Sequence, residues 1–148
     1  MTTIIRNIIN RRDITLRRRR RNRMTKQIRF IDHCSDMALA YKVSDIIVSA
    51  SVEPEAFGRV ADEAQSMDRP IIASNIGGSN ETVIDEKTGF LFESNNAKSL
   101  SIKILKVLSM DEASLQSIGK EGRKNIIQKF NVEKMCFSTY SEYKRILN

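Results

Sequence analysis

The chain has 148 residues, 41% of them apolar and 29% charged, which suits one folded domain and argues against a disordered chain. No apolar run is long enough to span a bilayer, and residues 1–10 lack the apolar stretch of a signal peptide, so we expect neither feature. Cys34 and Cys136 lie far apart and form no CxxC motif, which predicts two buried spectator thiols in a reduced, cytoplasmic setting.

Charge divides the chain into two parts. Residues 1–29 hold eleven Lys and Arg against one acid, Asp13, a net charge of +10, and the remainder holds fourteen bases against seventeen acids. The net charge of +7 therefore comes from one segment, and we predict a basic N-terminal segment at 1–26 before a domain at 27–148.

A run of arginines, Arg17, Arg23 and those between them, dominates the basic segment. Three interpretations are open: a solvated arm, a contact with an anionic membrane at its inner face, or a grip on nucleic acid. Each basic residue near an anionic leaflet contributes on the order of 1 kcal/mol, so this run is long enough to matter. No aromatic residues are interleaved for base stacking, which disfavours nucleic acid.

Short apolar runs alternate with stretches of helical periodicity along the rest of the chain. Strands are expected at 4–9 (short or incomplete), 28–31, 45–50, 71–74 and 89–92. Helices are expected at 35–43 with Ser35 as the cap, at 58–67, from Asn96 or Ser99 to about Leu108, at 111–129 and at 132–147. This alternation predicts an α/β fold with a Rossmann-like, doubly wound parallel sheet and C-terminal helices.

Glu55 and Glu63 lie eight positions apart, on either side of a loop-to-helix junction at Gly58. A helix start offers free N–H groups and a positive dipole end to a phosphate, and a glycine allows an anion to approach the backbone. Carboxylates repel phosphate but accept hydrogen bonds from hydroxyls. The spacing therefore predicts a nucleotide-sugar, with the sugar at one acid, the ribose at the other and the diphosphate between. Because Glu55 follows a strand, the ligand would lie at the carboxyl edge of the sheet.

This segment resembles the E-x7-E segment of retaining glycosyltransferases of the GT-B architecture, in particular glycosyltransferase family 4. The likeness covers roughly residues 28–147. It is carried by ordered blocks, which are Phe30-Ile31, Ala40-Tyr41-Lys42-Val43-Ser44-Asp45-Ile46, Ser49-Ala50-Ser51, Glu55-Ala56-Phe57-Gly58-Arg59-Val60, Glu63-Ala64, Pro70-Ile71-Ile72-Ala73-Ser74, Gly77-Gly78, Glu81 and Thr88-Gly89-Phe90-Leu91.

The resemblance implies roles for these residues. Glu55 would bond the donor sugar at the reaction centre, Glu63 would bond the ribose, and the backbone at Phe57, Gly58 and Val60 would contact the sugar and phosphate. Transfer to a surface polysaccharide or lipopolysaccharide acceptor would retain anomeric configuration and need neither a metal nor a cofactor. The alternative is that both glutamates are ordinary solvated acids.

Four further residues have more than one possible role. His33 is either a surface loop residue or a contact to the nucleotide base, and no other residues are spaced to form a metal site with it. Gly77 and Gly78 serve either a tight turn alone or a loop beside the cleft. Glu81 favours a local role at a short helix start.

The family's enzymes have two such domains, and the chain matches only the later part of the second. We therefore expect a truncated donor-binding half that is inactive alone, with the acceptor domain missing or supplied by another chain. The basic pair that balances the donor diphosphate in the family has no counterpart here, and Arg59 stands at a position that the family leaves variable. The rival hypothesis is a non-catalytic interaction module that uses its arginine-rich arm.

Three residues depart from the family pattern. Asp68 and Glu86 stand where glycine is usual, and a left-handed conformation there costs a non-glycine residue about 1–2 kcal/mol. Asp62 stands where a small or apolar residue is usual, and burial of its charge is unfavourable.

Overall fold

The computed structural model describes residues 4–6 and 34–147. The predicted strand at 28–31, the arginine run and His33 lie outside the described residues. The described strands are β1 (Ile4–Arg6), β2 (Ile46–Ser49), β3 (Ile71–Ser74) and β4 (Phe90–Phe92). The described helices are α2 (Met37–Lys42), α3 (Arg59–Ser66), α4 (Ser79–Thr82), α5 (Ala97–Leu108), α6 (Glu112–Lys129) and α7 (Val132–Leu147).

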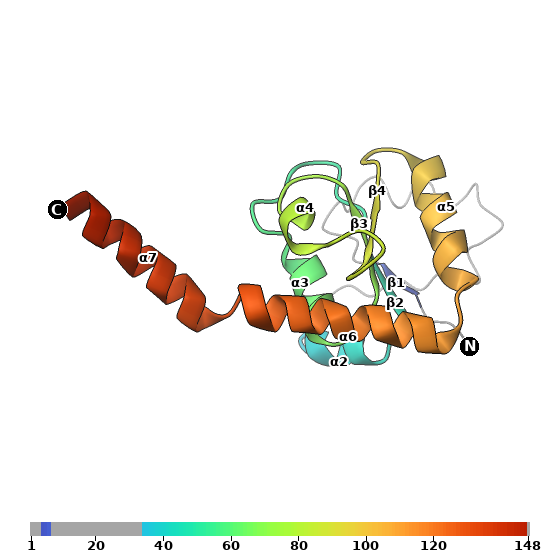
Figure 1. The fold of residues 1–148 in the computed structure, drawn as a ribbon. Coiled ribbons are helices and arrows are strands. Elements are labelled where there is room, and N and C mark those ends of the chain that lie inside the picture. The colour runs from blue at the N-terminus through green and yellow to red at the C-terminus, as the bar shows by residue number, and fades with distance from the viewer. Residues whose placement is uncertain (1–3, 7–33, 148) are drawn as a thin grey trace.

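The four described strands form one parallel sheet in the order β1-β2-β3-β4. Every residue of β2 and β3 is buried, as expected for parallel strands with helices on both faces. Helices α3 and α4 lie on one side of the sheet and α5 on the other (Figure 1). The α/β fold with a Rossmann-like parallel sheet and C-terminal helices is confirmed.

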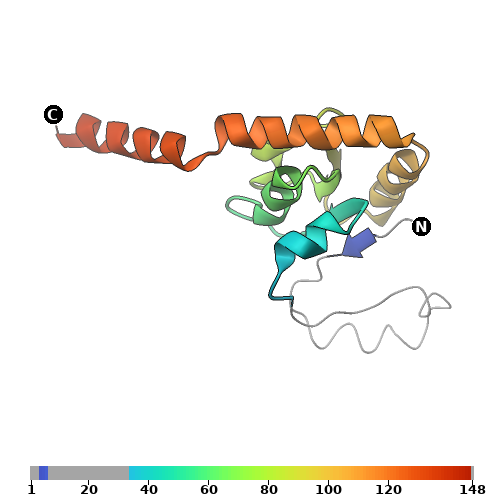
Figure 2. The same cartoon turned by 90° about the horizontal axis from the view of Figure 1, so that it is seen from below.

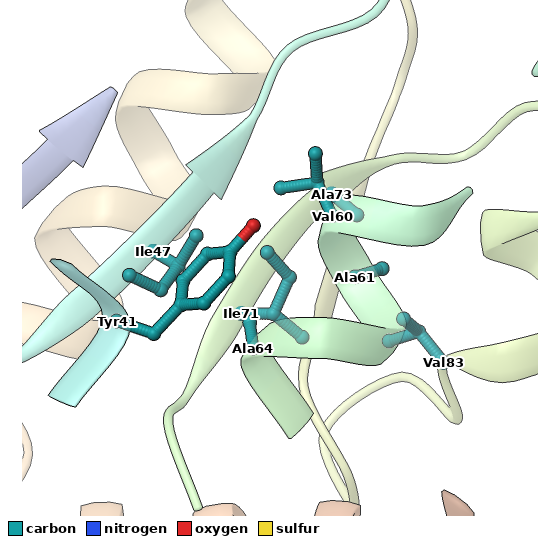
Figure 3. Close-up of a cluster of buried hydrophobic side chains, with 8 residues drawn as sticks. All are labelled: Tyr41, Ile47, Val60, Ala61, Ala64, Ile71, Ala73 and Val83. Atoms are coloured by element: carbon teal, nitrogen blue, oxygen red, sulfur yellow. The ribbon is translucent and has the colours of Figure 1, made fainter. Parts of the chain in front are cut away.

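Successive strand residues point to opposite faces, so the sheet has two separate cores. The site-side core joins β2 and β3 to α2 and α3, and its members are Tyr41, Ile47, Val60, Ala61, Ala64, Ile71, Ala73 and Val83. Figure 3 shows the Tyr41 ring among these residues, with the hydroxyl on the side where Val60 lies. The α5-side core contains the larger side chains, among them Phe90, Phe92 and Ile72. Its members are Ile46, Val48, Ile72, Phe90, Phe92, Val107 and Ile118.

Four described helices, α2, α5, α6 and α7, begin at polar caps whose side chains accept a backbone N–H bond, that of α7 being Asn131. The cap of α2 is Asp36, which accepts from Leu39 N at 2.8 Å, so the prediction of Ser35 was wrong. Asp36 directly precedes the first helical residue, and only from there does a carboxylate reach the third N–H of the helix. Asn96 caps α5, which resolves the choice between Asn96 and Ser99, and Asp111 caps α6.

Both predicted left-handed positions are confirmed, with φ of 57° at Asp68 and 65° at Glu86. The Asp68 turn lies against α6, where a Cβ on Gly119 would stand 2.2 Å from the Asp68 carbonyl oxygen. Glu86 lies on the α5 side of the sheet, where it pairs with Lys106 and Lys103 of α5. Hydrogen bonding to Lys106 lowers the pKa of Glu86.

Helix α7 extends away from the rest of the chain in both views (Figures 1 and 2). None of its residues is buried, and its exposed side chains include Cys136. Cys34 is half-buried, so the prediction of two buried thiols was wrong, because neither residue packs in either core. Among the described helices, none combines the length and apolarity that a membrane crossing requires.

Candidate functional site

The structure brings both glutamates to one pocket. Glu55 lies on the loop between β2 and α3, and Glu63 lies one turn into α3. The pocket has a volume of about 500 Å³, within the usual range for small-molecule sites. Its lining residues are Met37, Tyr41, Glu55, Ala56, Phe57, Gly58, Arg59, Val60 and Glu63.

The loop after β2, which lines the pocket, meets the loop after β3 at the carboxyl edge of the sheet. Gly78 N donates to the Glu55 carbonyl oxygen at 2.8 Å, so the loop after β3 supports the loop after β2. A Cβ on Gly78 would lie 2.3 Å from the carbonyl carbon of Phe57, and one on Gly77 would lie 2.5 Å from the Glu55 carbonyl oxygen. Gly77 also has φ of +58°. The glycine pair therefore serves a turn that packs closely against the backbone of the loop carrying Glu55 and Phe57, although neither glycine lines the pocket.

Gly58 is the N-cap of α3, with φ of 74° and no side-chain cap hydrogen bond. Glycine adopts this left-handed conformation without a steric penalty, which allows the loop to turn sharply into the helix. The first N–H groups of a helix have no partner within it, so this end of α3 presents donors and a positive dipole end to the pocket.

Each glutamate is held by neighbouring side chains. Ser51 Oγ donates to Glu55 Oε1 from the loop after β2. Tyr41 Oη donates to Glu63 Oε2 at 2.9 Å, and Arg59 Nη2 lies 3.0 Å from Glu63 Oε1. Burial, together with the bond to Glu63, raises the pKa of Tyr41 well above its usual range, so its hydroxyl stays protonated and donating. The glutamates face the same pocket with defined orientations.

Phe57 and Val60 differ in their contacts. The Phe57 ring is half-exposed and meets the ring of Phe130 edge to face, with centroids 6.0 Å apart. Val60 is buried in the site-side core, so only its backbone is suited to a ligand. Glu81 lies in the first turn of α4 and does not line the pocket, which agrees with a local role at that helix start.

Asp62 points away from solvent, directly beside Glu63 in sequence. It is 7% exposed, and neither of its carboxylate oxygens has a hydrogen-bond partner within the part of the chain that the structure describes. Burial raises the pKa of Asp62 to about 6. The expectation that this departure from the family pattern buries a charge is confirmed.

Comparison with known proteins identifies the family. The profile of the family described as glycosyl transferases group 1 matches residues 14–125. The chain belongs to this family. Among curated relatives, the capsular polysaccharide biosynthesis glycosyltransferase CapM of Staphylococcus aureus is 33% identical over 117 residues, covering 79% of this chain and 30% of the relative.

Solved structures of glycosyltransferases share the GT-B-type domain fold. A glycosyltransferase from Rickettsia africae superposes with a TM-score of 0.82 and 35% identity, covering all of this chain and 40% of the other. TarM of Staphylococcus aureus, solved with UDP, has a TM-score of 0.68 and 25% identity over 74% of this chain and 22% of its own. The chain thus spans less than half the length of these relatives.

Sequence reasoning assigned no role to two residues that hold the glutamates. Tyr41 stood inside a block of the resemblance, and Ser51 preceded Glu55 by four positions, but nothing in their spacing indicated a contact. Within residues 4–6 and 34–147, no group of three or more His, Cys, Asp and Glu side chains is placed to hold a metal ion.

Proposed function

We propose that the chain is the nucleotide-sugar donor-binding part of a retaining, metal-independent glycosyltransferase of family 4. The observation that carries the proposal is the placement of Glu55 and Glu63 on one pocket, on either side of a helix start that no side chain caps. The presence of UDP in the TarM structure supports a nucleoside diphosphate as the ligand class.

The pocket offers contacts for the diphosphate, the ribose and the sugar of such a donor. The diphosphate would lie over the N-terminus of α3, where N–H groups stabilise the charge that develops on the leaving group. Glu63 would accept hydrogen bonds from the ribose hydroxyls, and Glu55 from the sugar hydroxyls, because carboxylates act only as acceptors. The backbone at Phe57, Gly58 and Val60 would contact the sugar and phosphate.

The acceptor in this proposal is a surface polysaccharide or lipopolysaccharide. CapM, whose name places it in capsular polysaccharide biosynthesis, supports the first of these classes. An acceptor domain from the remainder of a longer protein, or from another chain, would complete the enzyme, and this chain alone would bind the donor without transferring its sugar.

Calorimetric titration of UDP-sugars and GDP-sugars into the wild-type chain and Glu63→Ala tests the donor site. We expect saturable binding to the wild type and at least a tenfold weaker affinity for Glu63→Ala, because the ribose loses a charged acceptor. Glu121→Ala, which removes a half-buried acid from α6 outside the pocket, is the matched control and should bind as the wild type does. Negligible heat with every nucleotide-sugar would contradict the proposal.

A further inference from the structure

The part of the pocket that the structure describes is poor in positive charge for the ligand proposed above. Of its nine described lining residues, Arg59 is the one cation, against the carboxylates of Glu55 and Glu63. A nucleoside diphosphate adds at least two negative charges, and like charges at close range repel. The chemistry of the ligand therefore demands a cation at the phosphates, and Arg59 follows the helix cap Gly58 directly.

In the structure, Arg59 is paired with an acid that the donor also needs. Its Nη2 lies 3.0 Å from Glu63 Oε1, and the Arg59 side chain is 83% exposed. The other oxygen of Glu63 accepts from Tyr41, a residue buried in the site-side core. One partner of Glu63 is thus fixed by packing, and the other is a solvated side chain on the surface.

We propose that Arg59 is the cation that binds the donor diphosphate, and that it exchanges Glu63 for a phosphate oxygen when the donor enters. This inference rests on the proposed function. Tyr41 keeps its bond to Glu63 throughout and holds the carboxylate toward the pocket. The exchange frees Glu63 Oε1 to accept from a ribose hydroxyl.

Three physical facts favour the exchange. Exposed ion pairs between residues four apart on a helix are weak, so little is lost when Arg59 leaves Glu63. A guanidinium binds phosphate through two parallel N–H bonds, and a diphosphate carries more charge than one carboxylate. Side chains on a helix leave the backbone toward its N-terminus, so Arg59 swings toward Gly58 along its own Cα–Cβ direction.

The exchange predicts a coupling between the two halves of the nucleotide. While Arg59 is paired with Glu63, the ribose hydroxyls compete with Arg59 for Glu63 Oε1. Once a diphosphate has drawn Arg59 away, the ribose hydroxyls meet a Glu63 Oε1 that is free of Arg59, while Oε2 keeps its bond from Tyr41. The diphosphate and the ribose hydroxyls should therefore strengthen each other's binding through Arg59, and the coupling should vanish without it.

Four probes measure this coupling by calorimetry: uridine, UDP and the 2′,3′-dideoxy form of each, with the guanosine series if guanine is the preferred base. For the wild type, we expect removal of the ribose hydroxyls to weaken UDP several-fold more than it weakens uridine. For Arg59→Met, UDP should bind about tenfold more weakly than to the wild type, and uridine should bind equally or more tightly. In this variant, removal of the ribose hydroxyls should weaken uridine and UDP by the same factor.

Lys98→Met is the control, because it removes one positive charge from an exposed position of α5 outside the pocket and should leave all four affinities unchanged. Tyr41→Phe keeps the ring in the core and should weaken UDP but not its dideoxy form. Equal weakening of uridine and UDP in Arg59→Met, or wild-type affinity for UDP, would overturn the exchange while the donor site stands. If the wild type binds no nucleotide of either series, the exchange and the proposed function both fail.

Discussion

The two sides of the sheet are built for different purposes. The α5-side core packs large apolar side chains such as Phe90 and Phe92 around β4. The site-side layer uses smaller residues, among them Ala61 and Ala64, and it also buries polar groups. Asp62 and the Gln65 side-chain oxygen have no hydrogen-bond partner there within the described residues. The difference indicates that the α5 side supplies stability, whereas the site side, which forms the pocket, is locally destabilised by these buried polar groups.

The largest expected effect tests the α5 side as a scaffold. Phe90 is 1% exposed, so Phe90→Ala should lower the free energy of unfolding by about 3–5 kcal/mol through lost burial and a cavity. The fraction that stays folded should bind nucleotide with wild-type affinity. Urea denaturation and calorimetry measure the two effects. Phe137→Ala on exposed α7 is the control, and a change there of more than about 0.5 kcal/mol would show that α7 packs against the body.

The next effect concerns Gly78, which packs against the backbone of the loop that lines the pocket. A methyl group on Gly78 would lie 2.3 Å from backbone carbon of Phe57, so Gly78→Ala should displace the loop that carries Glu55. We expect a loss of about 1–3 kcal/mol of stability and at least a tenfold weaker nucleotide affinity, measured in the same titrations. Asn80→Ala on the exposed surface of α4 should change neither quantity. Unchanged nucleotide affinity in Gly78→Ala would show that the loop after β3 does not hold the loop that carries Glu55 in place.

Asp62 gives a pH-dependent test of the cost on the site side. Its pKa is raised to about 6 in the folded chain, above that of an unfolded aspartate, so its charge opposes folding at neutral pH. The penalty is absent below about pH 4, grows between pH 4 and 6, and is complete above that range. Asp62→Ala should therefore stabilise the chain by about 2 kcal/mol at pH 7 and by much less at pH 4.

Urea denaturation at several pH values measures this effect. Glu133→Ala, on the exposed face of α7, is the matched control and should leave the pH dependence of stability unchanged. If Asp62→Ala changes stability equally at pH 4 and pH 7, the charge of Asp62 does not oppose folding, and the contrast between the two sides of the sheet is lost.

The smallest expected effect is the change in stability when glycine replaces the left-handed residues Glu86 and Asp68. Glu86→Gly should remove the backbone strain at φ of 65° and stabilise the chain by about 1 kcal/mol, reduced by the loss of its pairs with Lys106 and Lys103. Asp68→Gly should gain less, because aspartate tolerates this conformation better. Thermal unfolding measures both. A loss of stability in Glu86→Gly would show that the ion pairs outweigh the strain.

Sequence periodicity predicted most of the fold because buried parallel strands such as β2 and β3 are continuous apolar runs between helical patterns. The loop-to-helix junction at Gly58 and the left-handed Asp68 and Glu86 also followed from residue type and family pattern. The contacts between distant segments could not be predicted. Tyr41 reaches Glu63 across 22 positions, and Gly78 meets Glu55 across 23, because tertiary packing alone brings these residues together.

The two-sided account is tested most directly by amide chemical-shift changes during titration of a nucleotide-sugar that binds. The account predicts that the largest changes fall on Glu55, Gly58, Arg59, Val60 and Gly78, with α5 unaffected. Changes centred on α5 or α7, with the α3 N-terminus unperturbed at saturation, would contradict it.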